Sequence, residues 1–202
     1  MRSAILAALT ALALAGCGAP SVWAPDEAVS QAHYRHDGPP EITLFTVINN
    51  RSGEGAHSAL MINGSERIMF DPAGSWYHGW SPERNDVHYG ITPLIEKRYI
   101  DYHTRVTYRT VIQRIRVSPE VADRAIALAE GAGPVPKAMC ANSTSAILRQ
   151  LPGFESIPQS YFPKKVSEAF GALPGATFEI VYDDDDDDNS ALLAAQNSEA
   201  AN

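Results

Sequence analysis

Alternating apolar and polar positions predict a β-sheet in the first half of the chain. Residues 42–50, 56–63 and 67–74 are rich in Ile, Leu, Val, Met and Phe, and turn-forming residues separate them. Short segments bounded by turns in this way are typical of consecutive strands. Residues 98–118 alternate over a longer stretch and predict one bent strand or a hairpin, and residues 176–182 predict a last strand.

Helix signals dominate the second half. Residues 118–120 (Ser-Pro-Glu) combine a hydroxyl cap, a proline at the first helical position and an acid in the first turn. The helix that begins there is expected to stop at Gly131, and two more are expected over residues 140–151 and 163–173. Because this order segregates the helices from a mostly antiparallel sheet, it predicts an α+β fold with the sheet packed against a few helices.

Residues 75–97 form a long aromatic loop in this interpretation. Loops of such length are usually functional or mobile. Trp76 and Tyr89 from the loop, together with Asn142, are candidates for lining a substrate groove. The same rings could instead cap the core.

The N-terminal residues predict export and a lipid anchor. A basic start and an apolar run over residues 4–14 precede Leu-Ala-Gly-Cys at positions 14–17, which resembles the bacterial lipobox. The apolar run is shorter than the roughly 20 residues of a membrane-spanning helix. The motif implies a signal peptide over residues 1–16 and a bacterial membrane anchor of acyl chains, such as palmitate, on Cys17; an ordinary signal peptide with a chance cysteine is the alternative.

A lipid anchor of this kind implies a place in the cell. Residue 18 is Gly and not Asp, so nothing favours retention at the inner membrane. We therefore expect a periplasm-facing protein of the bacterial cell envelope, held at the outer membrane.

The charge pattern divides the rest of the chain. The formal net charge of −8 includes six consecutive aspartates, Asp183–Asp188, and such runs are most often solvated tails. We expect a flexible tether over residues 17–40, a folded domain over residues 41–182 and a disordered acidic tail over residues 183–202. With no basic patch, the chain gives no sign of a nucleic-acid partner.

Cys140 is the chemically informative residue. The only other cysteine is Cys17, so a lipidated Cys17 leaves Cys140 without an intramolecular partner in an oxidising compartment. An unpaired thiol of this kind is either buried and inert or reactive. A helix N-terminus is worth roughly 0.3 to 1 kcal/mol, which is less than one pKa unit. Activating the thiol therefore needs an imidazolium partner.

His57 is the best-placed of the six histidines to be that partner. It follows a glycine turn, and alternation puts it on one strand face with Ala59 and Met61. A tight turn over residues 63–65 folds the next strand back, so that Asp71 can approach His57 and orient its ring. Asp-Pro is also a common turn initiator, which leaves a turn role for Asp71 open.

The residues around these positions resemble a known superfamily. "GAHSALMINGSERIMFDPAGSW" (55–76), followed at a distance by "MCANSTSAIL" (139–148), is similar to the circularly permuted NlpC/P60, or permuted papain-like, cysteine hydrolases. The resemblance covers about residues 42–182 and implies a nucleophile at a helix N-terminus, a histidine base on a strand and a polar third residue on the next strand. By position these are Cys140, His57 and Asp71.

The resemblance also implies an acyl-transfer reaction. The expected function is an envelope-anchored cysteine hydrolase or acyltransferase that attacks an amide or ester, first of all a cell-wall peptide amide, through a thioester. A lipid-acting acyl hydrolase or acyltransferase and a non-catalytic envelope lipoprotein that uses the same fold for binding are the alternatives. No cofactor is expected, and no metal, because outside the tether no two ligand-type residues fall at the spacing of a zinc site.

Overall fold

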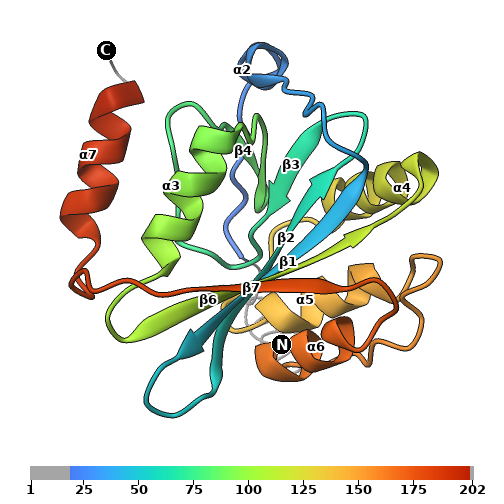
Figure 1. Ribbon diagram of the computed structural model, residues 1–202. Coiled ribbons are helices and arrows are strands. Elements are labelled where there is room, and N and C mark those ends of the chain that lie inside the picture. Colours follow the sequence, from blue (N-terminus) through green and yellow to red (C-terminus); the bar gives the residue numbers. More distant parts are fainter. Residues whose placement is uncertain (1–18, 201–202) are drawn as a thin grey trace, which may run out of the picture.

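One antiparallel sheet of seven strands forms the centre of the molecule (Figure 1). The structure is a computed structural model, and it describes residues 19–200. The strands lie in the spatial order β4-β5-β3-β2-β1-β6-β7 and comprise β1 (Glu41–Asn49), β2 (Gly55–Asn63), β3 (Arg67–Phe70), β4 (Glu83–Arg84), β5 (Val87–His88), β6 (Tyr108–Arg116) and β7 (Thr177–Val181). The described residues also hold six helices, namely α2 (Asp26–Ala32), α3 (Pro93–His103), α4 (Pro119–Glu130), α5 (Cys140–Leu148), α6 (Pro163–Gly171) and α7 (Ser190–Ala200). The predicted α+β class is confirmed.

Both faces of the central strands are covered, because apolar side chains point to each face in turn. Leu44 and Leu60 belong to a core that lies between the sheet and the helices α4, α5 and α6. Phe45 and Met61 belong to a second core under α3, with residues of α7 packed against it (Figure 1). Each such side chain contributes roughly 1.5–3 kcal/mol on burial. This two-sided packing fixes the register of the strands that carry the candidate site.

The prediction of strand structure for residues 98–103 was wrong, because this stretch is the C-terminal half of α3. The helix begins at a cap, where Thr92 Oγ1 accepts a hydrogen bond from the backbone N–H of Ile95 at 3.3 Å, and Pro93 follows at the first helical position. Its buried residues are Ile95, Tyr99 and Tyr102, which share one helical face. Packing of that face against the sheet stabilises the helix, and the strand of the predicted pair starts only at Tyr108.

Residues 183–200, expected as a tail, contact the domain in the structure and include α7. Asp185 pairs with Arg105 at 3.2 Å, and the backbone N–H of Val106 donates to the Asp185 carbonyl. Gln196 of α7 is fully buried against α3, and Glu199 pairs with Arg98 at 2.6 Å. The Arg105 charge offsets part of the repulsion within the aspartate run, and the contacts of Gln196 and Glu199 hold α7 beside α3 (Figure 1).

At the other end, the described part of the expected tether is attached to the sheet as well. Arg84 of β4 pairs with Asp26 at the start of α2, and its guanidinium lies 4.7 Å from the centre of the Trp23 ring. The signal peptide and Cys17 lie outside the described residues, so the lipid anchor stays a prediction. Among residues 19–200, no helix has the length and apolar character needed to cross a membrane.

Removing the cap of α3 is expected to lower stability. In Thr92→Ala the N–H of Ile95 loses its acceptor, and the free energy of unfolding should fall by about 1 kcal/mol. Urea unfolding measures the change, with Thr92→Ser as the control because serine keeps the acceptor oxygen. Equal midpoints for the two variants would show that the cap does not stabilise α3.

Candidate active site

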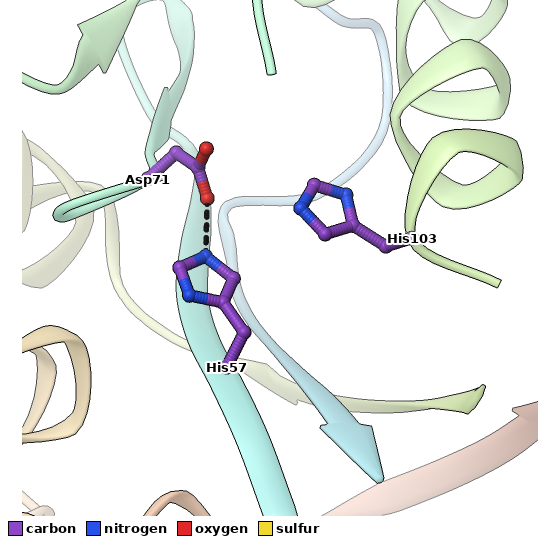
Figure 2. Close-up of side chains that lie close together, drawn as sticks. All are labelled: His57, Asp71 and His103. Atoms are coloured by element: carbon purple, nitrogen blue, oxygen red, sulfur yellow. Dashed lines mark hydrogen bonds and ion pairs between the residues drawn. The ribbon is translucent and has the colours of Figure 1, made fainter. Parts of the chain in front are cut away.

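A buried carboxylate and a histidine form the centre of the candidate site. The hairpin of β2 and β3 places Leu60 opposite Phe70, and Asp71 directly after β3 therefore reaches the ring of His57. His57 Nε2 lies 2.6 Å from Asp71 Oδ1, and Figure 2 shows the carboxylate pointing at the ring. Asp71 is 1 % exposed, so this contact is shielded from water. The two residues that the sequence singled out are brought together.

Gly74 makes the approach of Asp71 possible. A Cβ atom at residue 74 would lie 1.8 Å from Asp71 Oδ2, far inside any allowed contact. The backbone N–H of Gly74 also donates to the Asp71 carbonyl at 3.0 Å, closing a tight turn after β3. Asp71 therefore has both roles: it begins the turn after β3, and its carboxylate faces His57.

Tyr99 of α3 is a further partner that sequence reasoning missed. Its hydroxyl donates to Asp71 Oδ1 at 2.6 Å, the same oxygen that His57 contacts. Burial and the negative charge of Asp71 raise the pKa of Tyr99 well above its ordinary value, so the hydroxyl keeps its proton and remains a donor. The signal that could have found Tyr99 is the Thr-Pro cap of α3, which marks the helix that carries it.

The charges of Asp71 and His57 stabilise each other. Burial by itself disfavours both charged forms, but for Asp71 the charge of His57 and the hydrogen bond from it prevail, and they hold the carboxyl pKa well below its usual range. For His57, burial is again outweighed by the charge of Asp71 and their hydrogen bond, which raise its pKa to about 10. Both shifts favour the ion pair of carboxylate and imidazolium at neutral pH.

Cys140 completes the arrangement from the other side of the ring. It is the first residue of α5, and the chain enters the helix through Ala138 in the left-handed region, at φ 65°. Burial opposes ionisation of the thiol, but a hydrogen bond with His57 and the charge of that ring lower its pKa, and backbone hydrogen bonds from Ala141 and Ser58 add to this effect. Because His57 Nε2 faces Asp71, Nδ1 is the ring nitrogen available to the thiol. The pair can exist as thiolate and imidazolium, the reactive form of a catalytic cysteine.

No protein-family model, curated protein or solved structure matches this chain.

His103 is a third ring in the site that the sequence did not single out. It stacks on His57 with the ring centres 5.5 Å apart and the planes within 7° of parallel. Burial lowers the pKa of His103 to about 4, with the attraction of Asp71 too weak to compensate and the charge of His57 adding to the decrease. Donor atoms of His57, Asp71 and His103 all lie within 4.8 Å of one another, so these three side chains could hold a metal ion.

The three predicted lining residues lie in different surroundings. Trp76 is 2 % exposed and packs edge-on against Tyr99 at 5.3 Å between ring centres. Tyr89 is buried in the core under α4 and donates its hydroxyl to Glu130 at 2.9 Å, so it does not join the site. Asn142 is half-buried in the first turn of α5.

Two cavities flank the turn at residues 73–75. One, of about 270 Å³, is lined by His57 and His103, with Asp187 and Asn189 of the C-terminal segment on its wall. The other, of about 500 Å³, is lined by Trp76, by Tyr77 and by residues 134–137 just before α5. The smaller cavity therefore gives access to the His57 and His103 rings, and the larger one lies on the Trp76 side of the turn.

Ionisation of Cys140 should depend on Asp71. In the wild type, alkylation by iodoacetamide should rise less steeply between about pH 6 and 8 than for an ordinary thiol with a pKa near 8.5, which speeds up roughly 75-fold, because the pKa of Cys140 is lowered. In Asp71→Asn the His57 ring loses its proton at lower pH, the thiol keeps its own, and the alkylation rate should rise steeply with pH. The exposed Asp37→Asn is the control. A steep wild-type profile would contradict the thiolate-imidazolium pair.

The Tyr99 hydroxyl should stabilise the protein more than the Tyr102 hydroxyl does. Tyr99→Phe removes a donor from a buried carboxylate and should lower the free energy of unfolding by about 1.5–3 kcal/mol. Tyr102→Phe removes only a neutral contact to the Ser75 hydroxyl at 3.1 Å, worth about 0.5–1.5 kcal/mol. Urea unfolding of both variants at neutral pH tests the order, and a smaller loss for Tyr99→Phe would count against a charged Asp71.

Proposed function

We propose that the protein is a cysteine hydrolase or acyltransferase acting on amides or esters, with the permuted NlpC/P60-like arrangement. The observation that carries the proposal is the pair of hydrogen bonds that Asp71 accepts from Tyr99 and His57, because the charge of the His57 ring in turn lowers the pKa of Cys140. A buried inert thiol needs no charged imidazole beside it and no carboxylate behind that ring. The lowered pKa of Cys140 and the raised pKa of His57 both suit a nucleophile and its general acid and base.

The proposed reaction follows from the positions of the protons. The Cys140 thiolate attacks the carbonyl carbon, and the oxygen that gains charge is stabilised by free N–H groups in the first turn of α5. His57 then gives its Nδ1 proton to the leaving amine or alcohol, and a thioester remains on Cys140. Water, or another acceptor, gives a proton to His57 and attacks the thioester, which restores the thiolate. Asp71 keeps its charge throughout and orients the ring.

The substrate class follows from the expected location. A lipid anchor on Cys17 would hold the protein where cell-wall peptides are within reach, so a murein peptide amide is the first choice. The 500 Å³ cavity, whose lining includes Val22, Tyr77 and Val135, favours a second candidate, an acyl ester of a membrane lipid, because apolar surface of this kind accommodates acyl chains. Binding without catalysis is the remaining alternative, and Cys140 at 7 % exposure is the feature most compatible with it.

The test compares the wild type with Cys140→Ala on purified peptidoglycan and, in parallel, on phospholipid vesicles. Loss of the nucleophile should reduce product release at least about 10⁴-fold, as for other members of catalytic triads. Ser143→Ala in the same helix turn is the matched control and should retain activity. Mass spectrometry of the wild type should detect an acyl adduct on Cys140.

Each outcome separates one candidate from the others. Release of soluble peptides supports the murein amidase, and release of fatty acid supports the lipid-acting enzyme. Equal product from the wild type and Cys140→Ala would rule out the thiol mechanism. Failure of both substrates and of adduct formation would favour the non-catalytic lipoprotein.

A further inference from the structure

Three metal-ligand side chains meet beside the proposed nucleophile, although they are far apart in the sequence. His57 comes from β2, Asp71 follows β3, and His103 ends α3. One donor atom from each lies within 4.8 Å of the other two. Around a tetrahedral zinc ion with bonds of about 2.0–2.1 Å, donors are roughly 3.3 Å apart. The Asp71–His57 contact of 2.6 Å would therefore open slightly and His103 would move inward, both through side-chain rotation.

The imidazole ring of His103 already has the orientation that a metal ligand needs. His103 Nδ1 lies 2.9 Å from the carbonyl oxygen of Tyr99, and because a carbonyl can only accept, Nδ1 carries the proton. The lone pair is then on Nε2, and Figure 2 shows this side of the ring facing the Asp71–His57 pair. A hydrogen bond from the non-ligating nitrogen to a carbonyl is the usual support of a metal-bound histidine.

The Asp71 carboxylate can also serve as a metal ligand. Asp71 Oδ2 is buried against Gly74 and has no hydrogen-bond partner among the described residues, whereas Oδ1 faces His57 and is released from that ring when a metal takes the ring nitrogen. Tyr99 can keep its bond to Oδ1 when the metal binds. The cavity of about 270 Å³ lined by His57 and His103 provides a path by which an ion can enter and room for a water ligand.

We propose that His57, Asp71 and His103 form a binding site for a zinc-type divalent cation, with water from the cavity as the fourth ligand. The nitrogen that binds the metal, His57 Nε2, is the one that donates to Asp71 in the metal-free protein. Binding therefore breaks that hydrogen bond, forms the metal–nitrogen bond and releases one proton to solvent. Metal binding and the imidazolium form of His57 exclude each other, so the metal would switch off thiol chemistry; this consequence alone rests on the proposed function.

Binding is tested first without the thiol. Cys140→Ala, titrated with zinc chloride against a chromophoric chelator, should bind one zinc ion per chain. In the same background, His103→Asn should weaken binding at least about 100-fold, because loss of a second-shell partner alone typically weakens it 10- to 100-fold. His33→Asn, at a histidine whose side chain is 56 % exposed, is the matched control and should bind like its parent.

Two further measurements keep the result unambiguous. Thermal unfolding without metal shows whether His103→Asn remains folded, and zinc should raise the melting temperature of the parent but not of this variant. If His103→Asn does not fold, Asp71→Asn in the Cys140→Ala background takes its place and should lose the same affinity. X-ray absorption of the zinc-loaded wild type should show only nitrogen and oxygen ligands.

The outcomes that overturn the proposal are distinct from failure of the enzyme. No zinc binding by Cys140→Ala would show that any metal held by the wild type uses the thiol. Equal affinity of the parent and a folded His103→Asn, or equal loss in His33→Asn, would remove the site. In an active wild type, inhibition by zinc at the measured dissociation constant is expected. Zinc binding that leaves the reaction rate unchanged would overturn the exclusion of thiol chemistry.

Discussion

The hydrogen bond between Asp71 and His57 is the contact on which the rest of the site depends. A carboxylate that is 1 % exposed is costly to bury in its charged form unless positive charge and donors surround it. His57 provides both, and Tyr99 adds a second donor to the same oxygen. The strand pair, the capped helix α3 and the turn at Gly74 can each be understood as parts that hold these groups together. The state of Cys140 then follows from the charge of the ring beside it.

The parts of this site that could be predicted are those with local signals. Alternation and a tight turn were enough to pair His57 with Asp71, because the geometry of a hairpin follows from its turn. Cys140 could be placed at a helix start from the proline and glycine that bound its segment. Tyr99 and His103 could not be found in this way, because the alternation of apolar and polar residues over 98–118 predicts a strand where residues 98–103 form the end of α3. The capping pair Thr92-Pro93 was the contrary signal, and tertiary packing of Tyr99 and Tyr102 decided the matter.

Charge alone was a poor guide to the C-terminal segment. Six consecutive aspartates repel one another, but the outcome also depends on partners elsewhere in the chain, here Arg105, Thr107 and the apolar face of α3. Sequence patterns describe neighbours along the chain, whereas these partners lie about 80 residues away from the aspartates. The same limitation hid the approach of His103 to His57, which no spacing along the sequence indicates.

The docked C-terminal segment has a consequence for access to the His57 and His103 rings. Asp187 and Asn189 form one wall of the cavity beside these rings. Asp187 is held there by Thr107, whose backbone N–H donates to Asp187 Oδ1 at 3.1 Å and which does not itself line the cavity. The width of the opening beside His57 therefore depends on a contact made outside it, so a change at Thr107 would alter access to both rings without touching either of them.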